Sequence, residues 1–205
     1  MDEFDEAYKD HLYTNLKYDY FGVFSNVEPQ LLDGDVVGFT MTFTTNSPFA
    51  WSPEMEVSAD ATENESATIE ITVNNSEKYR EIFPMIEITG VNDGSASARE
   101  EITITNNSDN SYVMDGYHIV KTPRSLKLEV PHTEVYIDSE KAKIYDLVTV
   151  ASENIEHLLN FEDLGIQDIS YIYWPRLFNG TNEWVVEGNC HIVIKWREPR
   201  KVGAY

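Results

Sequence analysis

The sequence predicts a mainly β protein built around an antiparallel β-sandwich of the galectin-like, jelly-roll type. Three observations favour this fold class. Short runs of β-branched and aromatic residues alternate with clusters of Gly, Asn, Asp and Ser, which favour strands and turns respectively. The runs recur about every 8–15 residues, a spacing typical of sandwiches and jelly rolls. The last run, residues 190–197, alternates apolar and polar side chains with the period of two of a half-buried strand.

The N-terminal stretch predicts one short helix followed by an aromatic strand. Over residues 1–16, Asp2 is a suitable N-cap and acidic residues occupy the first turn. Apolar residues then recur every four positions, at Phe4, Tyr8 and Leu12. Residues 18–25 are rich in Tyr and Phe and predict a strand.

Residues 36–45 are the clearest strand in the N-terminal part. Its apolar positions share one face: Val37, Phe39, Met41 and Phe43. Pro48 ends the strand, because proline has no N–H to donate to a central ladder. Residues 49–53 then predict a link between two units.

From residue 55 onward the pattern predicts a regular succession of strands. They cover residues 55–59, 67–74, 85–90, 101–106, 112–120, 126–130 and 134–138, with turns at 91–94 and 106–110. Part of residues 144–164 instead predicts a short helix, which Ser152 or Asn154 could cap. Its apolar residues are Leu147, Val150, Ile155, Leu158 and Leu159. A closing meander follows, with strands at 171–174, 184–186 and 190–197 and turns at Asn179-Gly180 and Gly188-Asn189.

Composition narrows the function classes. The chain has 205 residues and a formal net charge of −21, which disfavours nucleic acid and anionic membrane surfaces as partners. No apolar run approaches the length of a membrane span, and residues 1–6 lack the apolar core of a signal peptide. Cys190 is the one cysteine, so the fold is expected not to depend on an internal disulfide.

No catalytic constellation is recognisable, so we predict a protein that is not an enzyme and has no cofactor or metal. The five histidines lack a second His or Cys at ligand spacing. Glu100 and Glu101 are neighbours on a predicted strand and therefore point to opposite faces. Residues 106–111 are polar enough to hold calcium, but they lack the EF-hand pattern and favour a turn.

Two groups of side chains are candidate contact residues. The C-terminal basic residues are either a solvated tail or a docking patch for an acidic neighbour, another copy included; they are Lys195, Arg197, Arg200 and Lys201. The tryptophans are either core residues, which we favour because of the apolar area that they bury, or a sugar-stacking platform. The candidate glycan contacts are Trp51, Trp174 and Trp184, with Trp196 as a further aromatic residue.

Two stretches carry a family resemblance. Residues 34–51 read GDVVGFTMTFTTNSPFAW, and residues 174–184 read WPRLFNGTNEW, with WREPRKVG at 196–203. Together with FPMIEITG at 83–90 and EITITN at 101–106, they resemble the distal tail protein family of bacteriophages with long, non-contractile tails and of their prophages. In that family a Ser-Pro-aromatic link leads into a galectin-like sandwich, whose closing hairpin is similar to the pattern PRL-x-NG-x-N.

The resemblance implies a structural role at the phage tail tip. Residues 1–50 would be a partial N-terminal tail-ring domain, shorter than is usual in the family, and residues 51–205 the galectin-like sandwich. Members form rings, commonly hexameric, mainly through the N-terminal domain. They join the tail tube and tape-measure proteins to the tail-associated lysin and receptor-binding components. The expected location is the virion, after synthesis in the bacterial host cytoplasm, with neither nucleic acid nor membrane as partner.

Two other function classes remain open on the sequence. A galectin-like sandwich is also compatible with a carbohydrate-binding module for cell-wall glycans, although a fold does not by itself determine a function. A cell-wall hydrolase would need two facing carboxylates in a concave pocket, and the sequence does not select such a pair.

Overall fold

The computed structural model describes residues 18–45, 49–74, 81–89, 99–115, 117–131 and 134–201. The chain divides into two compact units. The first contains the described residues up to Pro53 and from Glu198 onward, and the second contains those from Glu54 to Arg197. The predicted helix at residues 1–16 and the predicted turn at 91–94 lie outside the described residues. The mainly β, antiparallel fold class is confirmed.

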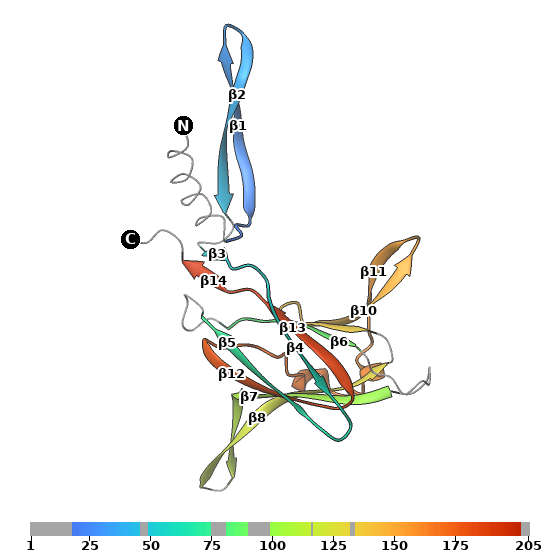
Figure 1. The fold of residues 1–205 in the computed structure, drawn as a ribbon. Coiled ribbons are helices and arrows are strands. Elements are labelled where there is room, and N and C mark those ends of the chain that lie inside the picture. The colour runs from blue at the N-terminus through green and yellow to red at the C-terminus, as the bar shows by residue number, and fades with distance from the viewer. Residues whose placement is uncertain are drawn as a thin grey trace, which may run out of the picture. The chain divides into compact units, whose positions relative to one another are not determined.

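The second unit is a sandwich of two antiparallel sheets (Figure 1). The larger sheet has the strand order β11-β10-β9-β6-β13-β4, and the smaller has the order β5-β12-β7-β8. The strands are β4 (Met55–Ala61), β5 (Ala67–Val73), β6 (Met85–Thr89), β7 (Arg99–Asp115), β8 (His118–Pro131), β9 (Val135–Asp138), β10 (Lys143–Val150), β11 (Glu153–Leu158), β12 (Gly180–Glu187) and β13 (Cys190–Trp196). Two 3₁₀ turns, η1 (Glu162–Leu164) and η2 (Ile169–Tyr171), precede β12.

The period-two pattern builds the core. In β13, Cys190, Ile192, Ile194 and Trp196 are buried while the residues between them are half-buried. β13 pairs with β4 on one side and with β6 on the other. In the facing sheet, Trp184 and Val186 of β12 point into the same apolar cluster. Burial of one face from each sheet is the arrangement that stabilises a sandwich.

The predicted helix within residues 144–164 is wrong, because β10 and β11 form a hairpin there. Its β-branched residues Val148 and Val150 favour strands over helices. Ser152, which the sequence suggested as a helix cap, instead lies in the tight turn with a φ of 73°. The apolar residues that suggested a helix therefore lie on both faces of a two-stranded ribbon.

The predicted turn at residues 106–110 and the predicted strand at 112–120 are also wrong. β7 continues from Arg99 to Asp115, with an irregularity in its pairing to β8 between Asn106 and Asn110. The chain reverses instead after Asp115, which pairs with His118. Polar residues are accommodated inside the strand because the Asn106 side chain bonds to groups distant in sequence.

The predicted strand at residues 171–174 is not present. This segment contains the end of η2 and then irregular chain leading to a single bridge between Leu177 and Ile82. The Asp168 carboxylate caps η2 by accepting a hydrogen bond from the Ser170 N–H at 2.9 Å. Pro175 follows closely and has no N–H to donate to a ladder.

The described part of the first unit contains two pairs of strands. β1 (Gly22–Leu32) and β2 (Asp35–Thr45) form a long hairpin whose turn, Asp33-Gly34, has positive φ at both residues. β3 (Phe49–Trp51) pairs with β14 (Pro199–Lys201), so the C-terminal strand belongs to the same unit as the N-terminal hairpin. β1 begins later and runs longer than the strand that the sequence predicts at residues 18–25.

Candidate interaction surfaces

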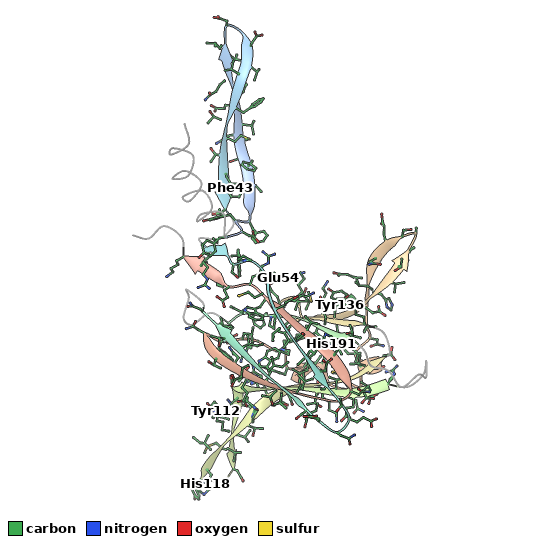
Figure 2. The ribbon with its side chains drawn as sticks, viewed as in Figure 1. Phe43, Glu54, Tyr112, His118, Tyr136 and His191 are labelled. Atoms are coloured by element: carbon green, nitrogen blue, oxygen red, sulfur yellow. The ribbon has the colours of Figure 1, made fainter. Side chains whose placement is uncertain are left out.

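The β1/β2 hairpin has one apolar face that the described part of the first unit leaves uncovered. Phe24 lies directly opposite Phe43, with ring centroids 5.0 Å apart, and Pro29 lies opposite Phe39. Residues opposite each other or two apart in a strand share a face, so Met41 joins this group. The large side chains Phe24, Phe39, Met41 and Phe43 are between 41% and 65% exposed, and Figure 2 shows Phe43 on the ribbon.

The opposite face of the same hairpin is mostly polar. Thr40, Thr42 and Thr44 alternate with the apolar residues of β2. The Gln30 amide donates a hydrogen bond to the Thr40 hydroxyl at 2.7 Å, and the Ser25 hydroxyl donates to the Thr42 carbonyl at 3.5 Å. The hairpin is therefore amphipathic. A two-stranded ribbon is marginally stable alone in water, so an uncovered apolar face is typical of a surface that packs against a partner.

A second exposed ribbon extends from the smaller sheet. β12 pairs with β7 only over Thr103–Asn106, so beyond Asn110 the ribbon formed by β7 and β8 has two free edges. We call residues 110–123 the β7/β8 arm; Figure 2 shows Tyr112 and His118 along it. Its exposed apolar side chains are Tyr112, Val113, Met114, Tyr117, Ile119 and Val120.

A third ribbon, the β10/β11 hairpin, extends from the edge of the larger sheet. Its pairing runs from Tyr145 opposite Leu158 to Val150 opposite Glu153. Exposed apolar residues lie on both faces: Leu147, Val148, Val150, Ile155 and Leu158. β-ribbons with exposed apolar residues and free edges are prone to pair with other chains.

The predicted basic cluster is divided between the two units. Lys195 and Arg197 belong to the second unit, whereas Arg200 and Lys201 belong to the first. Lys195 donates to Glu87 at 2.5 Å, and this hydrogen bond raises the pKa of Lys195. Arg197 lies 4.0 Å from Glu54.

In the first unit, Arg200 pairs with the buried Glu198, whose backbone N–H donates to the Ser52 hydroxyl at 2.9 Å. Acidic partners within each unit thus hold three of the four basic side chains. A docking role for Lys195, Arg197, Arg200 and Lys201 stays a prediction.

The tryptophans are distributed between core and surface. Trp184 has no exposed surface and Trp196 is buried, so Trp184 has no face available for the predicted glycan contact. Trp174 is partly exposed and packs edge-on against Phe161 with ring centroids 6.4 Å apart. Trp51 is partly exposed within β3 of the first unit. The three proposed glycan residues therefore do not form one exposed platform within either unit.

A polar network holds the segment before β12, and sequence reasoning found only part of it. Asn182 is fully buried. Its carbonyl oxygen accepts from the Phe178 N–H at 2.8 Å, and its amide donates to the carbonyls of Phe178, Gly180 and Ile71 at 2.8, 3.2 and 3.3 Å. The Asn182 side chain thus supplies hydrogen-bond partners for backbone groups of the turn before β12 and of β5.

The second half of the network joins the irregularity in β7 to the same segment. The fully buried Asn106 donates to the Arg176 carbonyl at 2.8 Å and to the Tyr173 hydroxyl at 3.2 Å. The Arg176 guanidinium donates to Asp109 at 2.6 Å and to Glu81 at 2.8 Å. The motif at 174–184 therefore has a structural role, because its side chains hold neighbouring segments together. The only sequence signal for Asn106 and Asp109 was an unusually polar run in a β-rich region.

Arg176 sets the ionisation of Asp109. Burial raises the pKa of the Asp109 carboxyl, but the hydrogen bond and the positive charge of Arg176 outweigh burial and lower that pKa below 3.8. The stability that this carboxylate contributes is present above the pKa of the unfolded chain, near 3.9, and is lost as pH falls through the lower folded value.

We expect Arg176→Ala to lower the free energy of unfolding by about 2–3 kcal/mol at pH 7, because Asp109 would be left buried with the more distant Arg124 as counter-charge. The difference from wild type should shrink at pH 3. Urea unfolding at both pH values measures it. Arg99→Ala is the matched control, since Arg99 forms an exposed pair with Asp163 at 3.7 Å and should cost under about 0.5 kcal/mol. Equal costs for the two variants would contradict the assignment.

Chemistry that would indicate catalysis is not apparent in the part of the chain that the structure describes. No group of three or more His, Cys, Asp or Glu residues there is placed to hold a metal ion. Burial raises the pKa of the Cys190 thiol to about 11, which leaves it a poor nucleophile. Among the same residues, no helix is long and apolar enough to cross a membrane.

Comparison with known proteins leaves the family open. No family model matches the chain, and no curated protein matches it. A solved structure from Desmodium yellow mottle tymovirus is similar with a TM-score of 0.23 and 10% identity, over 88% of this chain and 100% of that chain. A likeness at that level carries no argument about function.

Proposed function

We propose that the protein is a structural subunit of a multi-copy assembly, namely the distal tail protein at the tip of a phage or prophage tail. The observation that carries the proposal is the amphipathic β1/β2 hairpin. Its apolar face, formed by Phe24, Phe39, Met41 and Phe43, is exposed, while its polar face makes its own hydrogen bonds. An apolar face that the described part of its own unit leaves uncovered is typical of a surface that binds a partner.

Charge supports a second copy as that partner. The chain carries a net charge of −21, so two copies repel each other wherever acidic surfaces meet. The hairpin contains no Lys or Arg, and its three acids, Glu28, Asp33 and Asp35, lie off the apolar face or at the tip. The part formed by Phe24, Met41 and Phe43 is uncharged and allows close approach between copies.

The more specific assignment to a phage tail tip rests on the sequence resemblance at residues 34–51 and 174–184. The galectin-like sandwich and the N-terminal hairpin are compatible with that role. In the proposed assembly the hairpins form the ring, and the sandwich is presented to the tail-associated lysin and receptor-binding components. Immunogold labelling of phage particles tests the location, and label absent from the tail tip would refute it.

The apolar face has a direct test in solution. We expect wild-type protein to form a discrete oligomer and Met41→Asp to shift it to a monomer, because the added charge would be buried against the partner. The measurement is mass by light scattering at several concentrations.

Thr42→Asp is the matched control, since it adds the same charge at the next residue of β2 but on the polar face. It should leave the oligomer intact. A wild-type monomer at every concentration, or equal effects of the two variants, would contradict the proposal.

A further inference from the structure

We infer that the β7/β8 arm of one copy docks on the β10/β11 hairpin of the next copy. This inference rests on the proposed function, because it adds a second contact to an assembly that the β1/β2 hairpins form. It concerns two ribbons of the sandwich unit that the described part of that unit leaves uncovered.

The arm carries a compact apolar patch with one basic group. Met114 lies opposite Ile119, and two residues along the same face Tyr112 lies opposite Lys121. Tyr112, Met114 and Ile119 are 68%, 70% and 69% exposed. We call Tyr112, Met114, Ile119 and Lys121 the arm patch.

The β10/β11 hairpin carries the counterpart. Val148 lies opposite Ile155, and two residues along the same face Val150 lies opposite Glu153. Val148, Val150 and Ile155 are 43%, 51% and 49% exposed. We call Val148, Val150, Ile155 and Glu153 the hairpin patch. Each patch therefore has three apolar side chains and one charge, and the two charges have opposite signs.

The charge of the surrounding ribbons favours the same pairing. From Asp146 to Leu158 the hairpin has three acids and no Lys or Arg, whereas the arm, residues 110–123, has one base, Lys121, and one acid, Asp115, with Arg124 directly after it. Within the described residues neither Lys121 nor Glu153 forms an ion pair, although Arg124 is paired with Asp109. The arm itself has no net charge, so an acidic ribbon of another copy can approach it without net repulsion.

The placement of the two patches requires a head-to-tail contact. They lie on different ribbons, which project from opposite sides of the sandwich unit (Figure 1). A contact between different surfaces of identical copies is heterologous and closes into a ring when the rotation allows. Six side chains that are 43–70% exposed, at roughly 100 Å² each, bury about 600 Å², less than the about 1,200 Å² of a stable interface. The contact therefore supports an assembly held elsewhere.

Disulfide trapping tests the contact. In a chain carrying both Met114→Cys and Ile155→Cys, mild oxidation should produce a ladder of covalent species beyond the dimer, because each copy links to one neighbour through each site. Each single variant should give no ladder. The control pair is Val113→Cys with Leu158→Cys, which lies on the other face of both ribbons. The buried Cys190 is common to all variants.

Charge exchange gives an independent readout. Lys121→Glu and Glu153→Lys should each lower the yield of the 114–155 ladder about fivefold, as expected for one exposed charge pair, and combining them should restore it. An oligomer by light scattering without a 114–155 ladder, or with an equal ladder from the control pair, overturns this inference and leaves the proposed function standing. A monomer at all concentrations overturns the proposed function and this contact with it.

Discussion

Replacing Asn182 with alanine should lower the free energy of unfolding of the sandwich unit by about 3 kcal/mol, because each buried backbone group left without a partner costs about 1–3 kcal/mol. The side chain makes four hydrogen bonds in a site with no solvent access. Removing it leaves the Phe178 N–H and three carbonyls to find other partners. Urea unfolding followed by tryptophan fluorescence measures the loss, since Trp184 is two residues away in β12.

Thr181→Ala is the control for Asn182. Thr181 lies on the same strand, adjacent in sequence, but its side chain is exposed. Its removal should change stability by no more than about 0.5 kcal/mol. If Asn182→Ala were as mild as Thr181→Ala, the network would be dispensable and the motif at residues 174–184 would need another explanation.

Replacing Gly188 with alanine should cost about 3 kcal/mol or more, because a positive-φ strain of about 1–3 kcal/mol is joined by a steric clash. Gly188 connects β12 to β13 and has a φ of 107°. A Cβ atom there would lie 2.5 Å from the Glu101 carbonyl oxygen and 2.6 Å from Ile102 Cδ1. The carbonyl belongs to backbone in β7, so relief requires a shift of a central strand.

Gly180 separates the two causes of that cost. Its φ of 100° is similar, but a Cβ atom would meet nothing within 4 Å. Gly180→Ala should therefore carry the conformational cost alone, about 1–2 kcal/mol. Thermal unfolding of both variants gives the difference, which measures the clash. Equal losses of stability would show that the cost at Gly188 comes only from its dihedral angles and not from its contact with β7.

Local patterns in the sequence were sufficient for the central strands. The alternation in residues 190–197 predicts β13 because one face of this strand is buried in the core and the other is less buried and more polar. Residues 36–45 predict β2 in the same way. The turns at Asn179-Gly180 and Gly188-Asn189 were predicted because glycine tolerates positive φ. Both glycines have positive φ in the structure.

The misassigned segments depend on distant partners. Asn106 reads as a turn residue because asparagine is common in turns. It lies inside β7 because its amide bonds to Tyr173 and Arg176, which are 67 and 70 positions away in the chain. Similarly, the sequence of β10 and β11 suggested a helix because apolar residues lie on both faces of that ribbon. Only the pairing between the two strands shows that they form a hairpin.

The sequence by itself determined the fold class, the central strands and the uniform apolar face of β2. Only the tertiary structure decided that the described part of the first unit leaves this face uncovered, that the basic residues at 195–201 are divided between two units, and that Trp184 lies in the core. The physical reason is that alternation records which side chains share a face, whereas burial depends on which surface arrives to cover that face. For Phe39 and Met41, and for the arm and hairpin patches, we propose that this surface belongs to another copy.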